Sequence, residues 1–216
     1  NMDSLGQEKA WLWKLSPDGR KLLYGVRRGT DEEVETVDLY VVPISVAQGQ
    51  ATGPAVPVFE GLKSRHSYIA MQLLRWSPDA TRMAMPLHDG TQTTFWILSA
   101  EGREPIQFDE DVGWDSLWSP DGRMIAFSLD TQDRRMLRVI PAEGGTARTI
   151  LSTPKDQPAA FGWSPDSQEI VVACEGTITS LPVAGGTGRL LLRLQDAGYE
   201  SVSWLRWSPD GRHLAF

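Results

Sequence analysis

The sequence predicts an all-β protein, a β-propeller of four-stranded antiparallel blades. Three observations predict this fold: a repeated Ser-Pro-Asp tripeptide, a short apolar run after each copy, and no convincing helical periodicity. The intervals between the repeated serines are 61, 42, 45 and 44 residues, and three of the four match the roughly 40–45 residues of one propeller blade. The five copies begin at Ser16, Ser77, Ser119, Ser164 and Ser208.

Each tripeptide is expected to form a type I turn between the first two strands of a blade. Proline presets φ at the second position of such a turn, and a glycine tolerates the exit. Two copies have Ala80 and Ser167 in place of that glycine, so we expect a less tight or differently bulged exit there. The tryptophan before four of the five turns is expected to pack between adjacent sheets, where a large aromatic side chain buries most area.

Two further strand-like segments follow in each repeat. The third strands are "DLYVVPIS", "TFWILSAEG", "MLRVIPAEGG" and "TITSLPVAGG", and the fourth are "PAVPVFEG", "REPIQF", "ARTILS" and "GRLLLRL". The sequence therefore predicts one propeller domain over residues 1–216, with four complete blades and the start of a fifth. The expected blades are residues 10–60, 71–108, 114–151, 160–194 and 203–216.

The phrase "WSPDGRMIAF…LRVIPAEGGTARTI" resembles the TolB-like propeller repeat. A similar phrase occurs in the propeller domains of the prolyl oligopeptidase family. The resemblance covers residues from about Trp11 to Phe216, and it implies a ring that usually has six blades and a periplasmic or other extracytoplasmic bacterial location. It is specific for the fold and nearly silent on function, because propellers host unrelated activities.

The last repeat ends inside its second strand, which leaves an apolar edge without a partner. Such an edge invites aggregation. We therefore expect the sequence to be part of a six-bladed or larger ring. The alternative is a five-bladed ring that borrows strands from residues 1–10, although that segment is short and polar.

Composition excludes several classes of function. The net charge of −7 argues against nucleic acid as a partner, because binding to nucleic acid depends on neutralising phosphates. The single cysteine, Cys174, excludes an intrachain disulfide and is expected to be a small buried side chain rather than a reactive thiol. No stretch approaches eighteen apolar residues, so no membrane insertion is predicted.

The acidic residues gather in one set of connections. In an antiparallel blade, the second-to-third connections and the blade-to-blade connections lie on one face. These segments hold seven basic and sixteen acidic residues, a net charge of −9, against +2 for the rest of the chain. Long loops on a rigid scaffold often carry binding residues. We therefore expect a recognition patch built by Glu32, Glu33, Glu35, Arg65, His66 and Tyr68, with Asp109, Glu110, Asp111 and Trp114 nearby.

The motifs of common enzymes are missing from the sequence. "GWSPD" at Gly162 fails the G-x-S-x-G pattern, and no zinc spacing appears. We expect a non-enzymatic propeller, without cofactor or metal, that binds a protein or peptide with basic residues through anchors such as Tyr68 and Trp114. The first alternative is the substrate-gating propeller of a prolyl oligopeptidase-like peptidase whose catalytic domain lies outside this chain. The second is a metal-dependent carbohydrate lyase, which would need His66 or His88 as a metal ligand.

Overall fold

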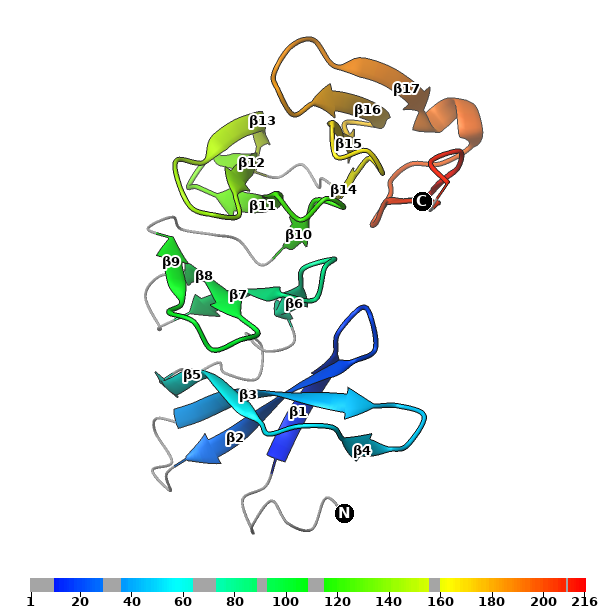
Figure 1. The fold of residues 1–216 in the computed structure, drawn as a ribbon. Helices are drawn as coiled ribbons and strands as arrows, with labels where there is room; N and C mark the ends of the chain where they lie inside the picture. The colour runs from blue at the N-terminus through cyan, green and yellow to red at the C-terminus, as the bar shows by residue number, and fades with distance from the viewer. Residues whose placement is uncertain are drawn as a thin grey trace. The chain divides into compact units, whose positions relative to one another are not determined.

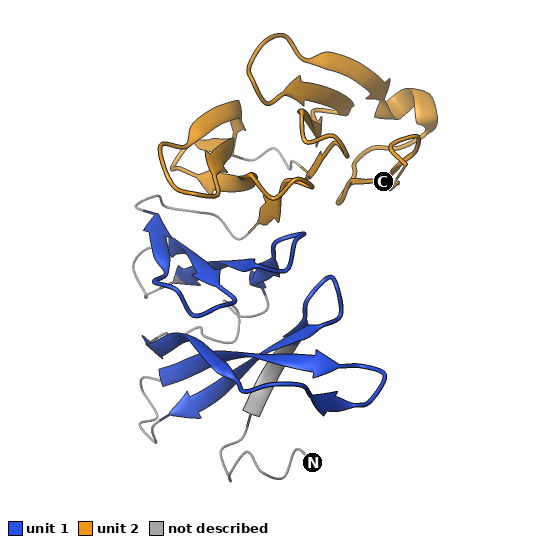
Figure 2. Cartoon of the chain, in the orientation of Figure 1, with its two compact units in different colours: residues 1–114 blue, residues 115–216 orange. Residues whose placement is uncertain are grey.

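The structure, a computed structural model, describes residues 10–28, 36–63, 73–88, 93–108, 115–155, 160–208 and 210–216. It confirms an all-β chain of antiparallel sheets in which strands adjacent in sequence pair with one another, except that the fifth strand pairs with the third (Figure 1). The chain divides into two compact units, residues 1–114 and residues 115–216 (Figure 2). No helix in the described ranges is long and apolar enough to cross a membrane.

The first unit holds two sheets that follow the first two repeats. The first sheet has four longer strands and one short strand, β4 (Gln50–Ala51), which pairs with the end of the third strand, β3 (Thr36–Ser45). The four longer strands are β1 (Ala10–Leu15), β2 (Lys21–Arg28), β3 and β5 (Val56–Lys63). The second sheet consists of β6 (Arg75–Trp76), β7 (Arg82–His88), β8 (Thr93–Ser99) and β9 (Ile106–Phe108).

The second unit holds two four-stranded sheets and one two-stranded sheet. The first consists of β10 (Ser116–Trp118), β11 (Met124–Asp130), β12 (Arg134–Pro141) and β13 (Arg148–Pro154). The second consists of β14 (Ala160–Trp163), β15 (Glu169–Cys174), β16 (Thr177–Pro182) and β17 (Arg189–Arg193). A 3-10 helix, η2 (Leu194–Ala197), then leads to the pair β18 (Arg206–Trp207) and β19 (Leu214–Ala215).

The Ser-Pro-Asp turns are held by their own side chains. In the third copy, the Gly122 N–H donates to the carbonyl oxygen of Ser119 at 2.9 Å, as a β-turn requires. The Ser119 hydroxyl donates to Asp121 Oδ1 at 2.6 Å and accepts the N–H of Met124 at 2.9 Å. The other four copies repeat these two side-chain bonds at the same distances. The tripeptide therefore fixes how the first two strands of each sheet meet.

The expectation of a looser exit at the two glycine-free turns was wrong. Ala80 and Ser167 have φ angles of 57° and 63°, close to the 68–71° of the glycines at this position. Their N–H groups donate to the carbonyl oxygens of Ser77 and Ser164 at 3.0 Å, so these exits are as tight as the others. A left-handed L-residue costs roughly 1–2 kcal/mol, and the serine and aspartate hydrogen bonds hold it there.

Two of the tryptophans before the turns, Trp76 and Trp163, join neighbouring sheets within a unit, as the sequence predicted. The indole N–H of Trp76 donates to the Lys14 carbonyl in the adjacent sheet at 3.3 Å, and that of Trp163 donates to the Leu117 carbonyl at 3.0 Å. Both side chains are buried and belong to apolar clusters. A large aromatic with a satisfied polar group thus connects consecutive sheets.

Candidate functional site

The loop face is defined here as the side of each sheet that carries its second-to-third connection and the connection to the following sheet. Because paired strands run antiparallel, these connections leave each sheet at one end, and the Ser-Pro-Asp turns leave at the other end, here called the turn face. In the second unit, the described loop-face residues are Asp115, residues 131–133, Lys155, Glu175–Gly176 and the β17–β18 connection.

The ten residues of the predicted recognition patch lie outside the described residues, so the patch stays a prediction. His66 is among them, and the side chain of His88 is also outside the description. Within the described ranges, no group of three or more His, Cys, Asp or Glu side chains could hold a metal ion. The ten residues are Glu32, Glu33, Glu35, Arg65, His66, Tyr68, Asp109, Glu110, Asp111 and Trp114.

In the first unit, a buried carboxylate ties three strands together near their loop-face ends. Asp38, in β3, accepts a hydrogen bond from Arg28 Nε at 2.9 Å and another from the Gly61 N–H at 2.7 Å. The same guanidinium donates to the Tyr40 hydroxyl at 3.3 Å. In the sequence, Asp38 is the acidic residue that begins the apolar run "DLYVV", and this position could have indicated a buried carboxylate.

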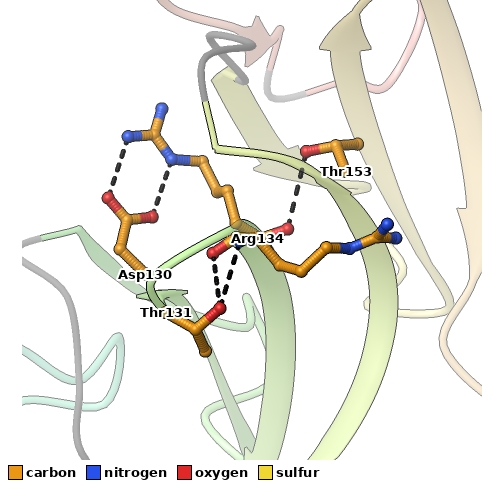
Figure 3. Close-up of polar contacts among 5 residues, drawn as sticks. Asp130, Thr131, Arg134 and Thr153 are labelled. Atoms are coloured by element: carbon orange, nitrogen blue, oxygen red, sulfur yellow. Dashed lines mark hydrogen bonds and ion pairs between the residues drawn. The ribbon is translucent and has the colours of Figure 1, made fainter.

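In the second unit, Asp130 and Arg135 close the β11–β12 hairpin (Figure 3). Arg135 donates to the two carboxylate oxygens at 2.8 and 3.0 Å. These bonds lower the pKa of Asp130 and raise that of Arg135. Between them, Thr131 exchanges hydrogen bonds with the backbone of Arg134, and Arg134 reaches Ser152 on β13 at 3.0 Å. In this part of the loop face, the charge of Asp130 is therefore paired with that of Arg135, and hydrogen bonds hold the hairpin loop in place.

A small void beneath Arg135 is not a ligand site. It lies between the two four-stranded sheets of the second unit and has a volume of about 10 Å³, which is about the space that one water molecule requires. It is lined by Ser128, Arg135, Met136, Leu137, Leu151, Thr153, Phe161 and Val172.

A larger hollow of about 240 Å³ opens on the loop face of the second unit. Its apolar floor comes from Ala173 and Leu194, which are buried, and from the half-buried Val202. Two exposed carboxylates, Glu175 and Glu200, stand on opposite connections around it. The full lining is Ala173, Cys174, Glu175, Gly176, Leu194, Glu200, Ser201 and Val202.

The two walls of this hollow are tied together by the backbone. The Leu194 N–H donates to the carbonyl oxygen of Gly176 at 2.8 Å, which joins the β15–β16 turn to the β17–β18 connection. The Leu194 carbonyl then accepts the N–H of Tyr199 at 3.0 Å. Leu194 also packs with Val171 and Ile178 in the core of the unit. The hollow is thus preformed.

The β15–β16 connection is a two-residue turn of Glu175 and Gly176, with φ angles of 50° and 69°. Two positive φ values are typical of a type I′ hairpin turn, which favours Asn-Gly. The preceding Cys174 is half-buried, and burial together with the nearby Glu175 carboxylate raises the pKa of its thiol. A protonated thiol is a poor nucleophile, which agrees with the expectation of an unreactive cysteine, although the side chain is not fully buried.

Two aromatic side chains are exposed in the β17–β18 connection. Tyr199 and Trp204 are each 52% exposed, and Tyr199 meets Phe216 edge to face at 5.5 Å between ring centroids. Exposed aromatic side chains are common anchors in protein interfaces. Neither these aromatics nor the hollow is predicted from the sequence, because the hollow depends on two segments about twenty residues apart in the chain.

The first unit has a separate groove of about 420 Å³ that involves the β8–β9 connection on the turn face. Phe59 and Trp96 meet edge to face in its wall, with ring centroids 5.3 Å apart. Its charged residues carry both signs: Glu60 and Glu104 are acidic, and Arg103 is basic. It is lined by Pro57, Val58, Phe59, Glu60, Trp96, Gly102, Arg103, Glu104 and Pro105.

No family model matches the chain. A curated relative, the "Uncharacterized peptidase YuxL" of Bacillus subtilis (strain 168), is 33% identical over 107 residues. The matched segment is 45% of this chain and 16% of that protein. The chain therefore matches about a sixth of the relative's length.

Three solved structures share the fold. An oligogalacturonate lyase in complex with manganese has a TM-score of 0.63 at 14% identity, covering 97% of this chain and 62% of that one. TolB from Acinetobacter baumannii has a TM-score of 0.56 at 14% identity, with coverages of 96% and 48%. The acylaminoacyl peptidase of Pyrococcus horikoshii has a TM-score of 0.55 at 13% identity, covering 90% of this chain and 33% of that one. The predicted fold, that of TolB-like propellers and of peptidase propeller domains, is confirmed.

Proposed function

We propose that this chain is a non-catalytic propeller that binds a protein or peptide partner through its loop face. The observation that carries the proposal is the preformed hollow in the second unit, which combines an apolar floor with two exposed carboxylates. The exposed Tyr199 and Trp204 add apolar contact area in the same connection. Concave sites with a few polar groups and exposed aromatic anchors are typical of recognition surfaces.

Two potential nucleophiles of the second unit are already engaged, which supports a role in binding rather than catalysis. Ser164, in the "GWSPD" segment, is buried and its hydroxyl donates to Asp166 at 2.6 Å. The raised pKa of Cys174 keeps its thiol protonated. The acidic patch predicted around Glu32 to Glu35 would add negative charge to the loop face of the first unit, and such charge would steer the approach of a partner with basic residues.

The test is a selection of random displayed peptides on the purified chain, followed by affinity measurements with variants. Asp115→Lys and Trp204→Ser change the loop face outside the hollow, and we expect each to weaken the selected peptides at least several-fold. The matched controls are Gln168→Lys, where three other repeats have arginine, and Val46→Ser, an exposed apolar residue of the β3–β4 turn. Peptides that respond to the two controls but not to the loop-face variants would overturn the proposal.

The second candidate is the propeller of a peptidase, in which the same face would admit peptides to a catalytic domain. The specific observation in its favour is the match to the peptidase YuxL at 33% identity. It predicts that the protein made by its native host has an intact mass well above 24.0 kDa and reacts with a fluorophosphonate probe for active-site serines. Peptide binding by a native protein that the probe does not label would favour the first proposal.

A further inference from the structure

We propose that the 240 Å³ hollow of the second unit is a subsite for one arginine side chain of the bound protein or peptide. The inference rests on the proposed binding role of the loop face and names the chemistry of the partner at one position. In this proposal, the carboxylates of Glu175 and Glu200 bind the guanidinium, and the apolar floor of the hollow packs against the aliphatic stem of the arginine.

The charges in the hollow lack a counterpart within the described chain. Neither Glu175 nor Glu200 takes part in a salt bridge with any described residue. Arg135 interacts electrostatically with Cys174, which lines the hollow, but its guanidinium makes its two hydrogen bonds to Asp130. The negative charge of the hollow is therefore available to a cation that arrives with a partner.

The floor selects a cation with an aliphatic stem. Ala173, Leu194 and Val202 present hydrocarbon, and the Cys174 thiol between them is neutral because its pKa is raised. A hydrated metal ion gains nothing from such a floor, and two carboxylates do not complete the oxygen shell that Ca²⁺ requires. Lysine and arginine bury their methylene stems on apolar surface while the charged head stays polar.

Arginine fits the geometry better than lysine. The two carboxylates stand on different connections, one on the β15–β16 turn and one on the β17–β18 connection. A guanidinium has five donors in a planar fork, so it can address two separate acceptors at once, and it is more weakly hydrated than an ammonium group. The Leu194–Gly176 backbone bond holds the two connections together before binding, so little ordering remains to be done when the side chain enters.

The position of Glu175 also agrees with a binding role. A type I′ turn is formed most easily by Asn and Gly, yet the first turn position carries a glutamate at φ 50°. Residues held in sparsely populated backbone conformations are often found at ligand sites. Here a residue that lines the hollow is held in a backbone conformation that glutamate rarely adopts.

The experiment uses acetyl-Gly-Arg-Gly-amide as the probe and acetyl-Gly-citrulline-Gly-amide as its neutral counterpart. Binding is followed at low salt through the methyl NMR signals of Ala173, Leu194 and Val202. Losing a hydrogen bond to a charged group lowers affinity by about tenfold or more. We therefore expect the citrulline peptide to bind the unchanged protein at least tenfold more weakly than the arginine peptide does. The arginine peptide should lose the same factor on Glu175→Gln or Glu200→Gln. The matched control is Asp196→Asn, which removes a nearby exposed charge that does not line the hollow.

Each outcome decides the question. Equal shifts with arginine and citrulline, or an effect of Asp196→Asn as large as that of Glu200→Gln, would overturn the arginine subsite. So would shifts confined to other methyl groups, or none at all. The same variants are then measured with the displayed peptides: peptides that bind the loop face but ignore Glu175→Gln and Glu200→Gln would refute the subsite alone. If the affinity of the displayed peptides does not change with Asp115→Lys or Trp204→Ser, the proposed function itself is refuted.

Discussion

The turn face and the loop face of the same sheets follow different rules. On the turn face, five Ser-Pro-Asp copies repeat one set of hydrogen bonds with side-chain distances of 2.6 and 2.9 Å. On the loop face of the second unit, the three connections that the structure describes throughout differ from one another: a threonine-closed hairpin loop, a two-residue turn, and a longer segment with a 3-10 helix.

This difference shows where the sequence is constrained by folding and where it is free to vary. The turn face aligns the strands of every sheet, so its chemistry repeats with the fold. The loop face has no common task in strand alignment, and its residues can serve a partner. Substitutions on the turn face should therefore destabilise the protein, whereas substitutions on the loop face should alter binding.

The largest expected effect is that of Trp163→Ala. Trp163 is 7% exposed and its indole N–H bonds to the Leu117 carbonyl. Truncating a buried tryptophan leaves a cavity and lowers the free energy of unfolding by about 3–5 kcal/mol. The control is Trp204→Ala on the loop face, where the side chain is 52% exposed and a loss within about 0.5 kcal/mol is expected. Urea unfolding measures both, and similar losses would contradict the division of roles.

The next effect is that of Ser119→Ala. The variant removes the acceptor of the Met124 N–H and the donor to Asp121, in a residue that is fully buried. A buried donor left without a partner costs about 1–3 kcal/mol of stability. Ser201→Ala, at an exposed loop-face serine, is the control and should leave the unfolding midpoint in urea unchanged. A neutral Ser119→Ala would mean that the turn is held without the serine hydroxyl, by Pro120, Gly122 and the bond from the Arg123 N–H to Asp121.

Local chemistry explains why the sheets could be predicted from the sequence. Proline, serine and aspartate act on residues within five positions of themselves, and the tryptophan before four of the five turns marks a strand that packs in the core. The left-handed exits at Ala80 and Ser167 could not be predicted, because the serine hydroxyl bond that outweighs the residue preference is visible only in three dimensions.

The candidate site was harder to predict, because it joins segments that are separate in the chain. Glu175 and Glu200 were counted among the acidic loop-face residues, yet nothing in the sequence shows that Leu194 bonds to Gly176 and brings them around one hollow. The predicted patch rested instead on the acidic connections of one face and on the general role of long loops. Loop length and charge indicate where a partner could bind, whereas they do not indicate which side chains converge.

A smaller effect of opposite sign is expected for Glu175→Gly. Glycine adopts φ near 50° freely, so the substitution relieves the left-handed conformation of Glu175 and should raise the free energy of unfolding by about 0.5–1 kcal/mol. It also removes one carboxylate from the hollow. Glu175→Gln keeps the backbone strain and should leave stability unchanged. Urea unfolding of both variants checks this, and a destabilised Glu175→Gly would show that the side chain serves the fold.

The smallest effect concerns the titration of one aspartate on each face. On the turn face, the Ser164 hydroxyl and the Gln168 N–H lower the pKa of Asp166, whereas on the loop face the Arg135 guanidinium lowers the pKa of Asp130. Both folded-state pKa values lie below the ordinary value of about 3.9 for an unfolded chain. Each carboxylate therefore contributes stability that is present above about pH 4 and is lost as the pH falls through its folded-state pKa.

The two carboxylates should respond differently to salt, because only one of them depends on a full charge. In 1 M NaCl, screening weakens the attraction of Arg135, so the pKa of Asp130 should move up toward its ordinary value. The pKa of Asp166 should stay low, since neutral hydroxyl and amide donors hold it. Carboxyl-detected NMR titration of both residues at low and high salt measures this, with Ser164→Ala as the variant that should raise the pKa of Asp166 alone. An equal rise of both pKa values with salt would mean that charge, rather than the serine hydroxyl, governs the turn face as well.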